Sequence, residues 1–333
     1  MSKGIRMQEL VLEYLEKFPK TPSLTLAKLI HKDYPWYCTV DSARSTIRRL
    51  RGSMGKVLRA KSKIHIPFES SLCPFDSLPE GLKDYADWST YVLESKSLLI
   101  LADIHAPYHD KESLTISLQH GKSLQPDTIV LLGDFMDFIS VSFWERDPRK
   151  RNFQHELEVG RQILQVIRTN FPNSKIIIKI GNHEERLERY LRVKAPELLG
   201  YEYLTYAKLL DPTGAFGINI VPDCRIMKID HLNMVHGHEF GRMIASPVNP
   251  ARGLYMRGKE IALCGHHHQT SQHTEKTMTG DIVSCWSVGC LCDLHPEYMP
   301  INKWNHGFAH VQIQDNSFVL NNYKIINGRV FNA

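Results

Sequence analysis

The stretch Leu98–His105 constrains the fold more than any other part of the 333-residue chain. It begins as a short apolar run without a helical period, which is typical of a buried strand. The run ends at Asp103 and His105, two residues apart, and an extended chain points such side chains to the same side. Pairs of metal ligands use this spacing, so the sequence predicts a strand that ends at a metal site.

Four further apolar runs end in the same way. Most of them pass through a glycine, which lets the backbone turn sharply. Strands that release Asp, Asn or His at their carboxyl ends can converge on one crevice of an α/β sheet. The runs and the residues that follow them are Thr128–Leu132 before Gly133–Asp137, Ile176–Ile180 before Gly181–Glu184, Leu232–Val235 before His236–His238, and Ile261–Cys264 before Gly265–His268.

Taken in order, the motifs DxH, GDxxD, GNHE, HGH and GHxH resemble those of the calcineurin-like metallophosphoesterases. The resemblance covers roughly residues 96–313. It implies an α/β fold, namely a four-layer α/β/β/α sandwich with two metal ions at the strand ends. Motif matching implies a first ion held by Asp103, His105, Asp134 and His268, and a second held by Asp134, Asn182, His236 and His266. Asp134 then bridges the two ions.

The implied ligands form a mixed oxygen and nitrogen shell without a thiolate. Such a shell suits Mn²⁺, Zn²⁺ or iron better than a soft metal, and we expect two divalent ions with Mn²⁺ favoured. The two ions carry more positive charge than the two aspartates neutralise. The centre therefore keeps a net positive charge, which suits an anionic substrate and a bridging hydroxide. Two-metal sites lower the pKa of a shared water and clamp both oxygens of an in-line displacement, which matches phosphate esters.

The resemblance also implies two residues for proton chemistry. His183 matches a family histidine that does not bind metal and instead protonates the leaving oxygen or stabilises the transition state. Asp137 matches the position that orients this histidine and favours its charged form. In the HGH motif we favour His236 over His238 as the ligand, and we place His267 outside the ligand set.

Other residues near these motifs stay outside the predicted site. Arg186 lies in a predicted helix after the GNHE turn and could reach a substrate phosphate on positional grounds alone. Cys285, Cys290 and Cys292 follow a CxxxxCxC spacing that has no second cluster to complete a metal site. We interpret these cysteines as packing or incidental residues.

Composition predicts a chain that stays in a reducing compartment. Hydrophobic residues make up 42% of it, enough for one large domain and a small one, yet no stretch approaches 18 continuous apolar residues. Charges interrupt the first residues, so they lack the apolar core of a signal peptide. Seven cysteines are an odd number, which argues against a disulfide framework. We therefore expect a cytoplasmic protein with no membrane partner.

The first 65 residues carry 14 Lys and Arg against 5 Asp and Glu, whereas the rest of the chain is mildly acidic. Helices are predicted at Ile5–Lys17, Ser23–Ile30 and Ala43–Leu50. Residues 1–66 resemble a winged helix-turn-helix domain, for which nucleic acid, specifically DNA, is the expected partner. The candidate contacts are Arg44, Arg48, Arg49 and Arg51, and a candidate basic wing contains Lys56, Arg59, Lys61 and Lys63. A solvated basic helix or a protein-docking module would give the same pattern.

The remaining chain divides into a linker and a catalytic domain. Residues 67–95 break the periodicity and predict a linker that packs on the catalytic domain, which we place at residues 96–333. Glu156–Asn170 is predicted to be an amphipathic crossover helix. Phe308–Ile313 and Phe318–Tyr323 alternate as an antiparallel pair, and we expect them to close the second sheet.

We predict a metal-dependent phosphoric ester hydrolase and favour a phosphodiesterase or nuclease over a phosphatase. The basic module selects nucleic acid, because a tether would raise the effective concentration of that substrate. The alternative is a phosphomonoesterase acting on a phosphoprotein or nucleotide, with the module binding another partner. Gly133–Ile139 lacks the Arg-Gly of the protein phosphatase motif GDxVDRG, which argues against a phosphoprotein. A DNA-binding regulator with an idle metal site would require lost ligands, and the motifs lack none.

Overall fold

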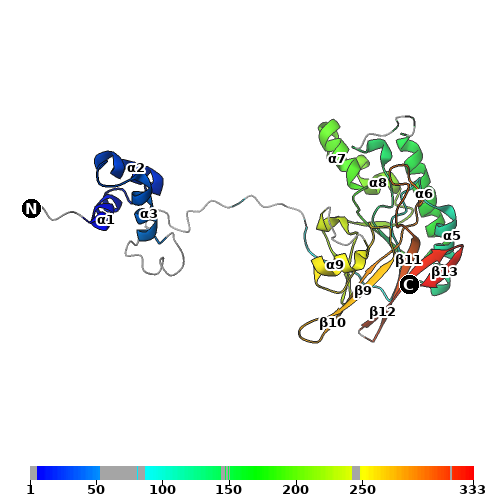
Figure 1. The fold of residues 1–333 in the computed structure, drawn as a ribbon. Coiled ribbons are helices and arrows are strands. Elements are labelled where there is room, and N and C mark those ends of the chain that lie inside the picture. Colours follow the sequence, from blue (N-terminus) through cyan, green and yellow to red (C-terminus); the bar gives the residue numbers. More distant parts are fainter. Residues whose placement is uncertain are drawn as a thin grey trace, which may run out of the picture. The chain divides into compact units, whose positions relative to one another are not determined.

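The chain forms two compact units in this computed structural model, Met1–Asp84 and Tyr85–Ala333, and the ribbon in Figure 1 shows both. The structure describes residues 6–52, 81, 87–143, 147, 149, 151–241, 248–315 and 317–333. The candidate wing at Lys56, Arg59, Lys61 and Lys63 lies outside these residues, as does most of the expected linker.

The described part of the N-terminal unit is a bundle of α1 (Met7–Lys17), α2 (Ser23–Asp33) and α3 (Val40–Leu50). Each helix turns one apolar stripe into a common core that contains fully covered leucine and isoleucine side chains. α3 begins three residues earlier than its pattern predicts, because Thr39 caps it. The Oγ1 atom of Thr39 accepts a hydrogen bond from the backbone N–H of Ser42 at 3.2 Å.

The described strands of the larger unit form two sheets (Figure 1). The seven-stranded sheet has the order β13-β12-β11-β2-β3-β4-β5, and the six-stranded sheet has the order β1-β6-β7-β8-β10-β9. The strand bounds are β1 Tyr91–Val92, β2 Ser97–Leu101, β3 Thr128–Leu132, β4 Lys175–Lys179, β5 Ile218–Val221, β6 Met227–Ile229, β7 Leu232–Val235, β8 Ala262–Cys264, β9 Ser271–Lys276, β10 Ile282–Ser287, β11 His306–Gln314, β12 Ser317–Ile326 and β13 Arg329–Asn332.

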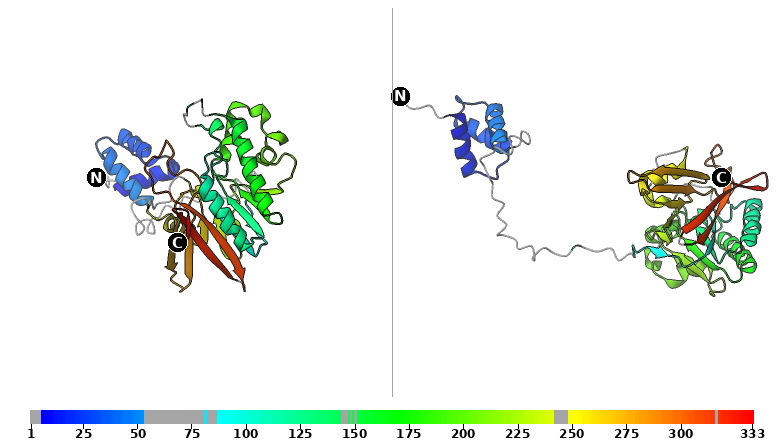
Figure 2. Two further views of the ribbon diagram at one scale, coloured as in Figure 1. Left: turned by 90° about the vertical axis from the view of Figure 1, so that its right-hand side faces the viewer. Right: turned by 90° about the horizontal axis from the view of Figure 1, so that it is seen from below.

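Helices cover the outer faces of both sheets (Figures 1 and 2). α5 and α6 pack against the seven-stranded sheet, and α9 packs against β8, β9 and β10. The α-helices are α5 Lys111–Leu124, α6 Phe153–Asn170, α7 Glu185–Lys194, α8 Tyr206–Leu210 and α9 Pro250–Gly258, and the 3-10 turns are η3 Ile139–Val141, η5 Pro196–Leu198, η6 Glu202–Leu204 and η7 His238–Phe240. Within the described residues, every helix is too short or too polar to cross a membrane.

The alternation of side chains in β2 explains why four layers form. Leu99 and Leu101 face the helices in one core cluster, whereas Leu98 and Ile100 face the second sheet in another. All four are buried, so this strand is apolar on both faces, as a strand between two layers must be. The predicted α/β/β/α sandwich is confirmed.

One expectation about the sheets is wrong. β11 and β12 do form an antiparallel pair, with Ile313 opposite Phe318. They do not close the second sheet, because β11 pairs with β2, with His310 opposite Leu99. The parallel part of the first sheet would otherwise end at β2, and β11 covers the backbone groups of that edge.

Candidate metal centre

The five motif loops meet at one place but come from both sheets. β2, β3 and β4 of the seven-stranded sheet lead to Asp103, Asp134 and Asn182, while β7 and β8 of the six-stranded sheet lead to His236 and the His266–His268 turn. The expectation of a crevice in a single sheet is wrong in this respect. The site spans the carboxyl ends of two stacked sheets, so the layers must pack together before it can form.

The spacing of Asp103 and His105 predicted an extended backbone at the site. The backbone there is instead turned. Asp103 and His105 have φ values of 53° and 52°, Asp134 has 50°, and His266 and His268 have 66° and 54°. These residues occupy the left-handed region, which costs free energy for side chains other than glycine. Each pair still converges, but through tight left-handed turns rather than through the alternation of a strand.

Two glycines allow the loops to approach this closely. Gly133 has a φ of 84°, and a Cβ atom there would collide with the imidazole of His236. A Cβ atom on Gly181 would collide with the carboxylate of Asp134. The glycines in the GDxxD and GNHE motifs therefore make room for the polar side chains of neighbouring loops.

Asp134 lies at the middle of the cluster. Its Oδ2 atom is 3.2 Å from Nε2 of His236 and 3.8 Å from Nε2 of His105. Its Oδ1 atom accepts a hydrogen bond from the backbone N–H of His183 at 2.9 Å. One carboxylate thus faces imidazoles on both sides, which is the arrangement a bridging ligand requires.

On one side of Asp134 lie Asp103, His105 and His268, which we call the first half of the centre. Nε2 of His268 is 3.3 Å from Oδ1 of Asp103 and 3.1 Å from Nε2 of His105. Asp103 is fully buried, and its carboxylate also accepts hydrogen bonds from the backbone N–H of His266 at 2.9 and 3.1 Å. These groups turn their ligand atoms toward one point.

On the other side lie Asn182, His236 and His266, which we call the second half. The ligand atoms of Asp134, His236 and His266 lie within 4.8 Å of one another. Nδ1 of His236 donates to the carbonyl oxygen of Leu132 at 2.8 Å, which leaves the lone pair of Nε2 for a ligand. Among the described residues, this Nε2 and the Oδ1 atom of Asn182 are buried without a hydrogen-bond partner.

The charges of the cluster explain why cations fit it. Burial opposes the ionised form of Asp103 and of Asp134, but the surrounding imidazoles outweigh burial and lower the pKa of both. Burial likewise opposes the charged imidazoles of His236 and His268. Carboxylates outweigh it for His236, and Asp103 together with Cys290 outweighs it for His268, so the pKa of each is raised to about 10. Divalent cations would displace these imidazole protons and neutralise the carboxylates.

The donor set passes the test for two divalent ions. Buried carboxylates, imidazole nitrogens and one amide oxygen converge, and the buried Oδ1 atom of Asn182, which has no hydrogen-bond partner among the described residues, fits a metal ligand. Asp103, His105, Asp134 and His268 would hold one ion, and Asp134, Asn182, His236 and His266 would hold the other.

His183 and Asp137 lie beside the first half. Nδ1 of His183 is 3.1 Å from the carbonyl oxygen of Asp137 and 3.3 Å from its carboxylate. The same carboxylate lies 3.2 Å from Nδ1 of His105, so Asp137 contacts two histidines instead of one. Asp137 therefore connects the proposed proton donor to a proposed ligand.

Arg186 contacts this pair, which its position in the sequence did not indicate. It donates to the carbonyl oxygen of Asp137 at 2.8 Å and to Nε2 of His183 at 2.9 Å. Since a guanidinium only donates, this Nε2 atom accepts, and the ring proton of His183 points to Asp137. Nε2 of His183 can take up a proton and pass it on only after Arg186 has moved away from that atom.

Two carboxylates that were not predicted to belong to the site fix the loops, and of these Glu184 is buried. Glu184 accepts hydrogen bonds from the backbone N–H groups of Asp134, Met136 and Gly181 at 2.8 to 3.0 Å, which joins the GDxxD and GNHE loops. Glu239 accepts from the backbone N–H groups of His236 and Gly237. A Glu that follows a glycine turn by a few residues is the signal that could have indicated such roles.

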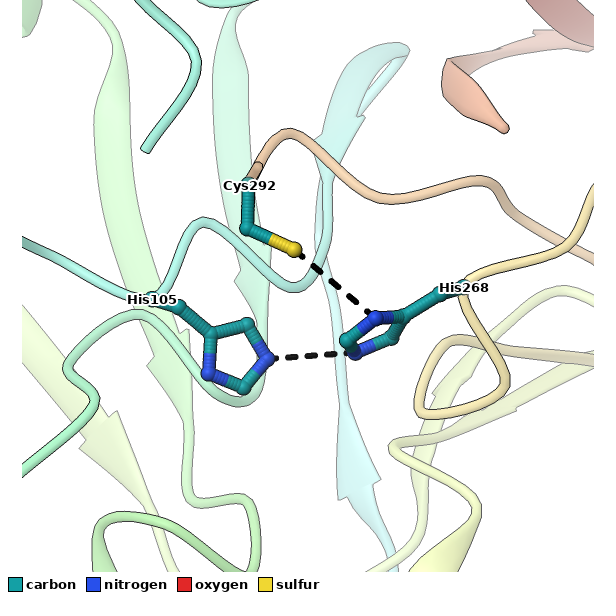
Figure 3. Close-up of side chains that lie close together, drawn as sticks. All are labelled: His105, His268 and Cys292. Carbon is teal, nitrogen blue, oxygen red and sulfur yellow. Dashed lines mark hydrogen bonds between the residues drawn. The ribbon is translucent and has the colours of Figure 1, made fainter. Parts of the chain in front are cut away.

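The cysteines of the CxC pair adjoin a proposed ligand, as Figure 3 shows for Cys292. Its Sγ atom is 3.7 Å from Nδ1 of His268, behind the nitrogen that faces the centre. Burial opposes the thiolate of Cys290, but Cys292 and His268 outweigh it and lower the pKa of Cys290 to about 6. Cys290 and Cys292 are therefore neighbours of the site, whereas Cys285 packs under α9.

The two histidines left out of the ligand set lie elsewhere. Nε2 of His238 pairs with Oε1 of Glu185 at 2.9 Å instead of with Asp134. His267 is not among the histidines whose ligand atoms cluster with His236 or His105 within the described residues.

The candidate nucleic-acid contacts lie on α3 or directly after it, and they divide into two kinds. Arg44, Arg48 and Arg49 are exposed on the helix. Arg51 instead donates to the carbonyl oxygen of Pro19 at 2.9 Å and to Ser23 at 3.1 Å, so it ties the helices of the unit together. Arg44, Arg48 and Arg49 are therefore the candidate contacts that solvent reaches.

Comparison with known proteins identifies the family. A model described as calcineurin-like phosphoesterase matches residues 96–278. The Gene 54 protein of Mycobacterium phage L5 is 26% identical over 248 residues, which are 71% of this chain and 96% of that protein, and its counterpart in phage D29 is 25% identical over the same shares. Vacuolar protein sorting 29 from Cryptosporidium parvum is a similar solved structure, with a TM-score of 0.41 at 14% identity, covering 72% of this chain and 96% of that one.

The family model spans more than half of the chain, and its residues carry every motif loop of the centre. The chain therefore belongs to the calcineurin-like phosphoesterase family, whose members are metal-dependent phosphoester hydrolases with a centre of two divalent ions.

Proposed function

We propose that the chain is a two-metal phosphodiesterase that cleaves nucleic acid. The observation that carries the hydrolytic part is the position of Asp134, whose Oδ2 atom faces His236 at 3.2 Å and His105 at 3.8 Å. The observation that favours nucleic acid is the exposed arginine face of α3, formed by Arg44, Arg48 and Arg49. We propose Mn²⁺ as the native ion, because the donor set is oxygen and imidazole nitrogen.

When bound, two divalent ions would activate a water molecule and neutralise the charge that develops on the phosphate. The chain's own residues supply the frame for this chemistry. Glu184 and the carbonyl oxygen of Leu132 fix the Asp134 loop and the His236 ring, so the ligand atoms are placed before a substrate arrives. The crowded, buried setting also removes water that would screen these charges.

We assign the proton transfer to His183. Asp137 holds the Nδ1 proton of this imidazole, which leaves Nε2 as the atom that faces the reacting group. A phosphate at the centre would attract the guanidinium of Arg186 away from Nε2, because a phosphate offers a bidentate anionic partner. Arg186 then becomes a phosphate contact, and the released Nε2 atom takes up a proton from solvent. The resulting imidazolium, whose Nδ1 proton is held by Asp137, gives the Nε2 proton to the leaving oxygen.

The test compares hydrolysis of bis-p-nitrophenyl phosphate and p-nitrophenyl phosphate with added Mn²⁺, together with labelled single- and double-stranded DNA. We expect diester and DNA cleavage. Turnover of the monoester while DNA stays intact would instead indicate the phosphomonoesterase.

The role of the basic face is tested in the full chain. Replacing Arg44, Arg48 and Arg49 by alanine should weaken DNA cleavage and reduce its dependence on salt, because fewer counterions are released on binding. The matched control loses the same charge elsewhere in the unit, through alanine at Lys17, Lys20 and Lys28, which are also exposed. Equal effects of the two triple variants would contradict a contact made specifically by α3.

A further inference from the structure

A cavity of about 230 Å³ opens beside the first half of the centre. His105 and Asp137 line its inner end, and the segment after Cys292 forms its outer wall. The volume lies below the roughly 300–1,000 Å³ that drug-sized ligands occupy. The cavity therefore suits a group of one ring system next to the reacting phosphate.

Aromatic side chains dominate the outer wall. The ring of Trp304 lies 4.1 Å from that of His268 and 6.2 Å from that of Tyr298, measured between centroids. Tyr108 also contributes to the lining. Because Trp304 touches a proposed metal ligand, a planar group stacked on this wall would lie one short linkage from the centre.

The polar part of the lining includes two carboxylates and the imidazole of His295 outside the centre. The two carboxylates are those of Asp293 and Glu297, and among the described residues that line the cavity none is Lys or Arg. A second phosphate would be repelled here, whereas a ring with amino or N–H groups would find hydrogen-bond acceptors. Carboxylates accept hydrogen bonds from the exocyclic amino group of cytosine in this way.

Hydrogen bonds hold the wall in shape. The side-chain amide of Asn302 donates to the carbonyl oxygens of Leu294 and Met299 at 2.7 and 2.8 Å, and its oxygen accepts from the backbone N–H of Trp304 at 2.9 Å. The next residue, Asn305, donates its backbone N–H to the carbonyl oxygen of His268 at 2.9 Å. The segment is thus tied to the loop of a proposed ligand, as a preformed binding site requires.

We propose that this cavity binds the nucleobase of the nucleotide next to the scissile phosphate and prefers a base with an amino group. The proposal rests on the proposed nuclease function, in which every phosphate has a base one sugar away. The aromatic rings supply the stacking surface, and Asp293 and Glu297 supply the acceptors. A small organic cation is the competing occupant, since aromatic rings and carboxylates also bind quaternary ammonium groups.

The experiment uses short DNA strands in which one cleavable linkage is flanked either by cytidines or by abasic tetrahydrofuran residues. Stacking of one base on aromatic side chains should give the full chain at least about a fivefold higher kcat/KM on the base-bearing strand. Trp304→Ala and Tyr298→Ala should bring this ratio toward one. Tyr203→Ala removes an exposed ring far along the sequence from the cavity lining and should keep the ratio.

The ratio separates recognition from a structural effect. If loss of Trp304 only disturbs His268, cleavage of both strands should slow equally and the ratio should stay unchanged. Tyr298→Ala is the second test, because it removes a ring that packs on Trp304 and leaves the contact between Trp304 and His268 in place. An unchanged ratio in both variants, or a ratio near one in the unaltered chain, overturns the proposal while the nuclease function stands. Absence of DNA cleavage, with bis-p-nitrophenyl phosphate still hydrolysed, overturns the nuclease function and the proposal with it.

Two further measurements test the chemistry of the occupant. Strands with cytidine should be cleaved faster than strands with thymidine, and Glu297→Gln and Asp293→Asn should reduce that difference. Equal cleavage of both bases overturns the preference for an amino group. Faster turnover of p-nitrophenylphosphorylcholine than of bis-p-nitrophenyl phosphate, lost in Trp304→Ala, would show an organic cation site and overturn the nucleobase.

Discussion

The two halves of the proposed metal centre differ in what holds their histidines from behind. In the second half, Nδ1 of His236 donates to a backbone carbonyl, that of Leu132, at 2.8 Å. In the first half, the rear nitrogen of His105 meets the Asp137 carboxylate at 3.2 Å, and that of His268 meets the Cys292 sulfur at 3.7 Å. The ring of His236 is thus held by the main chain, whereas the rings of His105 and His268 are held by side chains.

This difference means that the halves respond to different chemistry. A carbonyl oxygen has no proton to lose and cannot be oxidised, so the second half keeps its support under most conditions. The first half depends on a carboxylate shared with His183 and on a thiol, and a thiol can be oxidised. We expect the second half to act as a fixed frame and the first half to tune metal affinity and proton transfer.

Asp134→Asn should have the largest effect, because Asp134 belongs to both halves. Removing its charge weakens both ion sites, and we expect at least about a thousandfold loss of bis-p-nitrophenyl phosphate turnover, or about 4 kcal/mol of activation free energy. Metal content by elemental analysis should fall for both ions. Asp315→Asn, an exposed turn residue, is the control and should retain activity. Turnover close to normal in Asp134→Asn would sink the bridging role.

Glu239→Gln sharpens the comparison by weakening the frame of the second half. Burial opposes the ionised form of Glu239, but Lys179 and then His238 outweigh it and lower the pKa to about 2 from an ordinary 4.5. Lys179 is fully buried and its Nζ atom lies 3.1 Å from the Glu239 carboxylate. Removing the Glu239 charge leaves the buried ammonium of Lys179 without its carboxylate, so we expect the free energy of unfolding at pH 7 to fall by about 3 kcal/mol.

The sign of the pH dependence follows from the lowered pKa of Glu239. Its contribution to stability is present above pH 4.5 and is lost as the pH falls toward 2, when the folded protein must also take up the proton. Urea denaturation of the metal-free protein at pH 7 and pH 3 measures this difference. The difference in the free energy of unfolding between Glu239→Gln and the unaltered chain should be smaller at pH 3 than at pH 7. Glu188→Gln breaks an exposed pair with Arg192 and should change little at either pH.

The sequence indicated the proposed ligands because each follows a recognisable strand. Asp103, Asp134, Asn182, His236 and His266 stand within a few residues of a strand end, where short-range pattern fixes their place along the chain. It did not indicate that two sheets supply them, because strand pairing depends on contacts far apart in sequence, such as β11 on β2. It also assumed extended backbone where Asp103 and His105 adopt left-handed turns.

Residues that act from behind the ligands could not be predicted in the same way. Cys292 reaches His268 across 24 positions of sequence, and Asp137 reaches His105 across 32. Both separations are far longer than the short-range periods of helices and strands, so no local sequence pattern could reveal these contacts. Arg186 was noticed for its charge, yet its contact with His183 depends on how α7 begins. These roles depend on contacts between side chains that come together only when the two sheets and their helices have packed.

His183→Ala tests the side-chain network next to the first half. We expect turnover to fall about a hundredfold or more while both ions stay bound, because general acid catalysis typically contributes this much and His183 is proposed not to bind metal. Turnover with bis-p-nitrophenyl phosphate and metal content are measured together. The control is His231→Ala, whose side chain is 74% exposed. Loss of an ion in His183→Ala would make His183 a ligand or a support of the fold.

Cys292→Ala should have the smallest effect and bears most directly on the contrast between the halves. Without the sulfur, Nδ1 of His268 loses its acceptor, and loss of such a partner typically costs 10- to 100-fold in metal affinity. We expect about a tenfold weaker binding of one Mn²⁺ ion and little change for the other, measured by calorimetric titration of the metal-free protein.

The control for this variant is Cys285→Ala, which removes an equally buried thiol whose Sγ donates to the carbonyl oxygen of Glu260 at 3.2 Å, away from the proposed ligands. If both variants weaken metal binding alike, the effect is one of packing, and the sulfur behind His268 has no special role. If only Cys292→Ala weakens metal binding, and only for one ion, then the Cys292 side chain sets the metal affinity of the first half.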